Sequence, residues 1–134
     1  MAMRLNNAAA SAAADSTGLR AYINNASTPI LKFYTGNVNG TPESVPAGTL
    51  LATVTLAAFG AATNGAIAST GGSVAAAASG TAGCWALFRP DGTTKVADGS
   101  VAQTSGGDIN FDVIIWVAGG TVTMGTFTIT VPPA

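Results

Sequence analysis

The chain has 134 residues, the length of one domain, and its 5 Lys and Arg against 6 Asp and Glu give a net charge of −1. Charged residues make up 8% of the chain, where an ordinary soluble domain has about 25%. A surface so poor in cations cannot neutralise phosphates, so we expect no nucleic-acid partner. The longest apolar run, residues 113–118, is far shorter than the roughly 18 residues of a membrane-spanning helix, so we expect no membrane partner.

Helical spacing marks the N-terminal part of the chain. Apolar residues over residues 5–23 recur at intervals that place them on one helix face, with Asn6 or Asn7 as the N-cap. Gly18 weakens the middle of this helix by about 1 kcal/mol relative to Ala, so two short helices are the alternative. We therefore expect a helical segment or arm over residues 1–27.

After Pro29 the hydrophobic pattern changes to alternation, which indicates strands. The strands are expected at residues 30–36, 49–57, 66–69, 84–89, 93–97, 108–117 and 121–131. Turn residues separate them and no helices alternate with them, so a parallel sheet is not expected. The sequence therefore predicts a mainly β fold: an antiparallel β-sandwich or jelly roll over residues 28–134, with a short N-terminal helical segment, forming a single domain overall.

Three of these strands carry predictions about individual side chains. In the second strand, one face is expected to hold Leu50, Ala52, Val54 and Leu56. In the strand at 108–117, the inward side chains are expected to be Ile109, Phe111, Val113, Ile115 and Val117. In the last strand the apolar residues change from even to odd positions around Gly125, which predicts a bulge or bend there.

The stretch "RPDGTTKVADGS", residues 89–100, holds two Asp-Gly pairs, at Asp91 and Asp98. Asp-Gly is typical of turns, and the residues between the two pairs have the composition of one short strand. If that strand is extended, the two carboxylates lie about 20 Å apart at ~3.3 Å per residue, too far to share one metal ion. The stretch also lacks the alternating acidic ligands of a calcium loop. We interpret both aspartates as strand ends.

No residue pattern points to catalysis or to a bound metal. The chain has no His, which excludes Ser-His-Asp and Cys-His arrangements. Asp108 and Asp112 lie four residues apart on one expected strand, about 13 Å from each other, beyond the separation of paired glycosidase carboxylates. The single cysteine, Cys84, is interpreted as a buried hydrophobe, and a lone thiol fits a reducing cytoplasm. We expect a non-enzymatic protein with no catalytic residue, no cofactor and no metal.

Five stretches of the chain resemble a known family when they are taken together. They are "RLNNAAASAAAD" near the start, "LKFYTGNVNGTPESVPAGTLLATVTL", "AFGAATNGAIAS", "WALFRPDGTTKVADGSV" and the ending "GGTVTMGTFTITVP". They are similar to the capsid cement, or decoration, proteins of tailed bacteriophages. The resemblance implies a non-enzymatic β-sandwich or jelly-roll protein that binds the outside of the icosahedral shell, and it brings no catalytic residues.

The resemblance also implies where the protein acts and with what. The expected partner is the major capsid protein, with self-association as a favoured dimer or alternatively a trimer. The expected location is the capsid exterior of the virion, after synthesis in the host bacterial cytoplasm. The candidate capsid-interface residues are Arg4, Leu5 and Arg20. A surface of small polar residues with few charges agrees with this role, since charge is depleted at interface cores.

Two other functions stay open at this point. A tail, fibre or head-fibre module could bind a host-surface glycan if Trp85 and Trp116 are exposed, although an aromatic residue in an apolar strand is more often part of the core. A small hydrolase using Asp108 or Asp112 is the third possibility.

Overall fold

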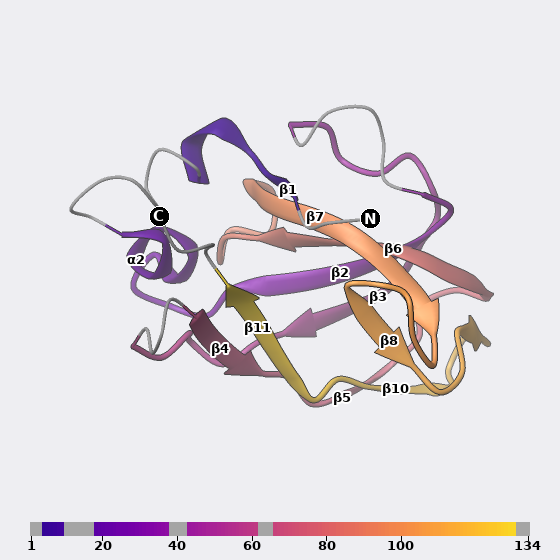
Figure 1. The fold of residues 1–134 in the computed structure, drawn as a ribbon. Helices are drawn as coiled ribbons and strands as arrows, with labels where there is room; N and C mark the ends of the chain where they lie inside the picture. The colour runs from indigo at the N-terminus through magenta and orange to yellow at the C-terminus, as the bar shows by residue number, and fades with distance from the viewer. Residues whose placement is uncertain (1–3, 10–17, 38–42, 62–65, 131–134) are drawn as a thin grey trace.

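The computed structural model describes residues 4–9, 18–37, 43–61 and 66–130, and these build β-structure in two layers (Figure 1). The main path of the larger sheet runs β1 (Arg4–Leu5), β7 (Lys95–Gln103), β6 (Gly80–Phe88), β2 (Ile30–Thr35) and β3 (Leu50–Thr55). All neighbours along this path are antiparallel. Two short strands complete the sheet: β8 (Ile109–Phe111) joins β7 in a parallel pair, and β9 (Ile115–Trp116) joins β6.

Two ribbons of two strands each cover one face of the larger sheet, on its lower side in Figure 1. One ribbon pairs β10 (Thr121–Thr123) with β5 (Ser73–Ala75), and the other pairs β11 (Thr126–Thr130) with β4 (Ala66–Thr70). The main core lies between these layers, where the rings of Trp85 and Phe127 meet edge to face at 5.1 Å. The mainly β, antiparallel architecture is therefore confirmed.

The N-terminal residues do not form the continuous helix over residues 5–23 that is one of the two predicted arrangements. Leu5 lies in β1, where it pairs with Ala97, and α2 (Leu19–Asn24) begins only after Gly18, whose φ is 79°. The side chain of Asn6 accepts a hydrogen bond from the Ala9 amide, so Asn6 caps a short helical turn at residues 7–9. Strand pairing at the sheet edge overrides the weak helix propensity of this segment, and residues 1–3 and 10–17 lie outside the described residues.

The prediction for the second strand holds at three of its four positions. Ala52, Val54 and Leu56 are buried in the main core, as expected. Leu50 packs instead on a smaller cluster on the opposite face of the sheet. The cause is a register shift in the β2–β3 pair, since Phe33 pairs with Ala52 but the next residue, Tyr34, pairs with Leu50. The residue between, Leu51, is the extra residue of a bulge and points into the main core.

The interpretation of the two Asp-Gly pairs as strand ends is right for the first and wrong for the second. Asp91 lies in a turn, where its carboxylate accepts hydrogen bonds from the amides of Thr93 and Thr94. Asp98 is fully buried in the middle of β7. Gly99 is there for space and not for a turn, because a Cβ at Gly99 would lie 2.2 Å from the Asp108 carboxylate and 2.6 Å from the Trp85 ring.

A buried ion cluster explains why a carboxylate occupies this interior position. Nε and Nη2 of Arg4 donate to the two oxygens of Asp98 at 2.8 and 2.7 Å, a bidentate pair. Nζ of Lys95, whose side chain is 3% exposed, donates to the same carboxylate at 2.6 Å. Lys95 also donates to the main-chain oxygen of Ser44. The cluster therefore connects β1, β7 and the segment that leads into β3.

The predicted irregularity at Gly125 is confirmed. The chain changes partner there, because β10 pairs with β5 and β11 pairs with β4. Val122 and Met124 are buried before the break, and Phe127 and Ile129 are buried after it.

Replacing Asp98 with Asn should destabilise the fold by about 3 to 5 kcal/mol, because Lys95 then stays buried without a counter-charge. Denaturant unfolding of the purified protein measures the loss. The control is Asp112→Asn, an exposed carboxylate, which should change the free energy of unfolding by less than about 0.5 kcal/mol. Equal midpoints for the two variants would show that the ion cluster does not hold the fold together.

Candidate interaction surface

The segment after β8 presents apolar side chains to solvent. The prediction that Val113, Ile115 and Val117 point inward is wrong, since these side chains are 59%, 67% and 66% exposed. Trp116 takes the inward position instead, and its Nε1 donates to the Val113 oxygen at 2.9 Å. In an extended segment the neighbours of an inward residue face outward, so burying Trp116 turns Ile115 and Val117 to the surface. Alternation counted from the tryptophan would have identified this surface from the sequence.

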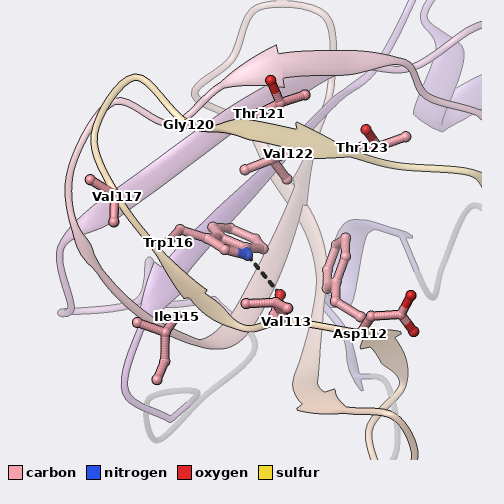
Figure 2. Close-up of a pocket in the computed structure, with 10 residues that line it drawn as sticks. Asp112, Val113, Ile115, Trp116, Val117, Gly120, Thr121, Val122 and Thr123 are labelled. Atoms are coloured by element: carbon pink, nitrogen blue, oxygen red, sulfur yellow. Dashed lines mark hydrogen bonds between the residues drawn. The ribbon is translucent and has the colours of Figure 1, made fainter.

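These exposed side chains border a cavity of about 450 Å³ between residues 111–117 and β10. Figure 2 shows Val122 pointing from β10 toward the Trp116 ring, while Ile115 and Val117 point outward. Asp112 lies at one end of the cavity. We call Val113, Ile115 and Val117 the aliphatic surface. Only one further large hydrophobic side chain among the described residues, Val45, is similarly exposed. Clustered exposed apolar side chains mark interaction sites, whereas single ones do not.

The structure places the three predicted capsid-interface residues on two elements. Arg4 lies on β1 with its side chain 25% exposed, and its guanidinium binds Asp98. Leu5, the next residue, is half-buried and packs against the main core. Arg20 is exposed on α2. Arg4 and Leu5 therefore have structural roles in the sheet, and the contact of all three with a capsid stays a prediction.

Both tryptophans belong to the core, which confirms the more common interpretation of such residues. Trp85 is 1% exposed and Trp116 is 8% exposed. Trp116 packs edge to face against Phe33 and Phe111, with ring centroids 5.5 and 5.2 Å apart. Neither tryptophan offers a flat face to a sugar.

The carboxylates of Asp108 and Asp112 do not share a strand, since β8 includes neither of them. Asp108 joins β8 to β7: its Oδ2 accepts from the Ser100 amide at 3.1 Å, and its own amide donates to the Ser100 hydroxyl at 3.2 Å. Asp112 is exposed directly after β8. Among the residues that the structure describes, no three His, Cys, Asp or Glu side chains gather as metal ligands.

Cys84 is fully buried in the small cluster on the second face of the sheet, as its interpretation as a hydrophobe predicts. Burial, with a smaller contribution from the charge of Asp98, raises the pKa of this thiol to about 11. At neutral pH the thiol is protonated and covered, so it is a poor nucleophile.

Comparisons of the chain with known protein families, with curated proteins and with solved structures found no match. None of the helices in the described part of the chain is long and apolar enough to cross a bilayer.

Cys84 should resist alkylation in the folded protein. At pH 9 the thiol of the unfolded chain is about half ionised, whereas the folded thiol, with its pKa raised to about 11, keeps its proton. Iodoacetamide labelling followed by mass spectrometry should therefore be at least about 100-fold slower in buffer than in denaturant.

The same shift predicts the sign of a pH effect on stability. Between about pH 9 and 11 the folded chain retains a proton that the unfolded chain loses, so the free energy of unfolding should fall as the pH rises. Cys84→Ala should reduce that fall. Rapid labelling of the native protein would show that the thiol is accessible and would contradict both expectations.

Proposed function

We propose that this is a non-enzymatic structural protein of a bacteriophage virion, which binds the outside of the capsid and stabilises the shell. The observation that carries the proposal is the aliphatic surface, three branched side chains more than half exposed on a chain in which only 8% of residues are charged. The resemblance to capsid cement proteins supports the same function. We propose that the two β layers form the sandwich or jelly roll of that family.

Cement acts by linkage, because it binds the assembled lattice and not the separated subunits. Each bound copy then adds a free energy that must be lost before the shell opens. Each of the three side chains is about two-thirds exposed, so burying them against the major capsid protein contributes on the order of 4 kcal/mol per copy, at 1.5 to 3 kcal/mol for a side chain that goes from fully exposed to fully buried. This is no larger than the cost of immobilising a protein, which is at least about 4 kcal/mol.

One copy therefore gains too little from this surface alone, and repeated contacts must supply the rest. Self-association provides them, since a dimer or trimer binds the lattice through several identical surfaces at once. We propose an oligomer on the capsid exterior, with the dimer favoured and the trimer as the alternative. The chain is made in the host cytoplasm and joins the shell there.

The other two functions find less support. A glycan-binding tail or fibre module would need an exposed aromatic platform, and both tryptophans are buried. A hydrolase using Asp108 or Asp112 would need a pair of carboxylates held together, whereas Asp108 is engaged with Ser100 and Asp112 lies beyond the end of β8.

Particles that lack the protein should keep their DNA under mild conditions and release it at a lower temperature than decorated particles. The measurement is dye fluorescence during heating, with and without the protein added back. If both kinds of particle open at the same temperature, the protein does not stabilise the shell.

The aliphatic surface should be needed for this effect. Replacing Val113, Ile115 and Val117 together with Ser should weaken binding to stripped particles by at least about 100-fold, since the lost apolar contact corresponds to several kcal/mol per copy. Val45→Ser, at an exposed valine outside this surface, is the matched control and should bind normally. Thermal unfolding of both variants should stay close to the wild type. Normal binding by the triple variant would exclude this surface as the contact.

A further inference from the structure

The strand β10 has one open edge. In an antiparallel pair, successive residues turn their main-chain groups alternately toward and away from the partner strand. The Gly120 oxygen accepts from Ala76 at 2.8 Å, and the Met124 amide donates to Gly72 at 3.0 Å, so the even-numbered residues face β5. Thr121 and Thr123 therefore turn their amides and carbonyls away from β5, and no other described residue hydrogen-bonds to these groups.

The strand β11 continues this open edge. In β4, the oxygens of Thr70 and Ala68 accept from residues 57 and 60, so these two residues face away from β11. Their register partners are Thr126 and Thr128, which therefore direct their main-chain groups to the outer side as well. The irregularity at Gly125 keeps the even residues of β10 and the odd residues of β11 facing their partners. Four threonines thus share one edge.

A groove lies along this edge, and a second strand borders its other side. The cavity beside β10 shares Phe111 and Thr123 with a second cavity of about 410 Å³ between residues 108–111 and residues 123–128, so the two cavities are adjacent along the edge. In β8, the Phe111 oxygen accepts from Thr104 at 2.8 Å and so faces β7. Alternation turns the main chain of Asn110, which lines the second cavity, away from β7.

We propose that this groove binds an extended segment of a partner protein, which adds a strand to the open edge of β10 and β11. The unpaired amides and carbonyls of the four threonines provide main-chain hydrogen bonds, which is the basis of recognition by strand addition. Val113 and Ile115 also line the first cavity and are more than half exposed, so they provide apolar contacts for side chains of the added strand.

The charges at the groove specify the chemistry of that segment. Among the residues that the structure describes, Asp108 and Asp112 are the only charged ones that line the two cavities. An extended segment with Arg or Lys among β-branched residues complements them.

A second copy of this chain does not supply such a segment, because its cations are already engaged or lie on a helix. Arg4 and Lys95 bind Asp98. Lys32 donates to Gly92, and Arg89 donates to Tyr22. The remaining cation, Arg20, is on α2. The partner is therefore a different protein.

The identification of the partner as a shell subunit rests on the proposed function, whereas the recognition chemistry does not.

The probe is the blocked heptapeptide Thr-Val-Arg-Val-Arg-Val-Thr, titrated into isotope-labelled protein. The controls are the same peptide with Glu in place of Arg, and one with Pro in place of the central Val, which cannot form a continuous strand. Amide hydrogen exchange is the readout.

The basic peptide should bind with one copy per chain and slow the exchange of the Thr121 and Thr123 amides at least about tenfold. The acidic and the proline-containing peptides should bind at least about tenfold more weakly. Asp112→Asn should reduce the preference for the basic peptide, whereas Asp91→Asn, in the exposed turn, should not.

A pair of variants at Thr121 tests the main-chain contact directly. Thr121→Pro removes an amide that faces the groove and not β5, so the β10–β5 pairing tolerates it while the peptide loses a donor. Thr121→Ala keeps the amide and should bind like the wild type. Equal binding of all three peptides, no binding of the basic peptide, or protection outside β10 and β11 would each overturn the proposal.

The particle assay separates this inference from the proposed function. If the protein stabilises particles but its Thr121 and Thr123 amides gain no protection from the basic peptide, strand addition is wrong and the shell function stands. If the peptide binds as described but the protein leaves particles unchanged, the groove stands and its partner is not a shell subunit.

Discussion

The fold depends on one buried carboxylate. Asp98 lies in the middle of β7 without contact to water, and it is stable there only because two cations contact it, Arg4 from the sheet edge and Lys95 from the same strand. Arg4 thereby fixes a strand of two residues that is too short to hold by main-chain pairing alone. Lys95 reaches the main chain at Ser44 and so holds the connection between β2 and β3 over the second face of the sheet. In a chain with so few charges, three of them are committed to one internal site.

The same part of β7 sets the packing of the main core. Asp98 faces one side of the sheet, and Gly99, the next residue, faces the other, where the Trp85 ring occupies the space that a side chain would fill. Trp85 in turn contacts Phe127 of β11, so the same ring joins the larger sheet to the ribbon layer. The open edge of β10 and β11 belongs to this ribbon layer. The groove is therefore positioned by core packing and not by loops, which suits a site that must present a straight strand edge.

Hydrophobic alternation was enough to predict the β class, the strands at β2, β3 and β4, and the change of phase at Gly125. Hydrophobic alternation failed where a single local feature shifts the alternation.

The bulge at Leu51 moved Leu50 to the other face of the sheet, because the register depends on strand pairing that cannot be seen in the sequence. Residues 113–117 include more apolar residues than inward positions. Alternation counted from Ile109 assigns the inward positions to Val113, Ile115 and Val117, whereas the large Trp116 ring is the side chain that points inward. Asp98 was misassigned because Asp-Gly is a turn signal only when the aspartate is solvated, and its distant partner Arg4 is 94 residues away in sequence. The aliphatic surface was missed because the alternation was counted from Ile109 and not from Trp116.

An exposed strand edge is a hazard that proteins usually suppress with Lys, Pro or a covering loop. Residues 121–128 contain neither Lys nor Pro, and the side chains at the edge are threonines, which pair readily. The two carboxylates beside the groove protect the edge against pairing with another copy in a different way.

If two copies paired through these edges, each would bring Asp108 and Asp112 toward the same residues of the other copy, and like charges facing one another oppose that pairing. A basic strand reverses the sign of the interaction. In this proposal the edge is closed to other copies of the chain and open to a segment of opposite charge, so the proposed self-association uses a different surface from the one that receives the partner.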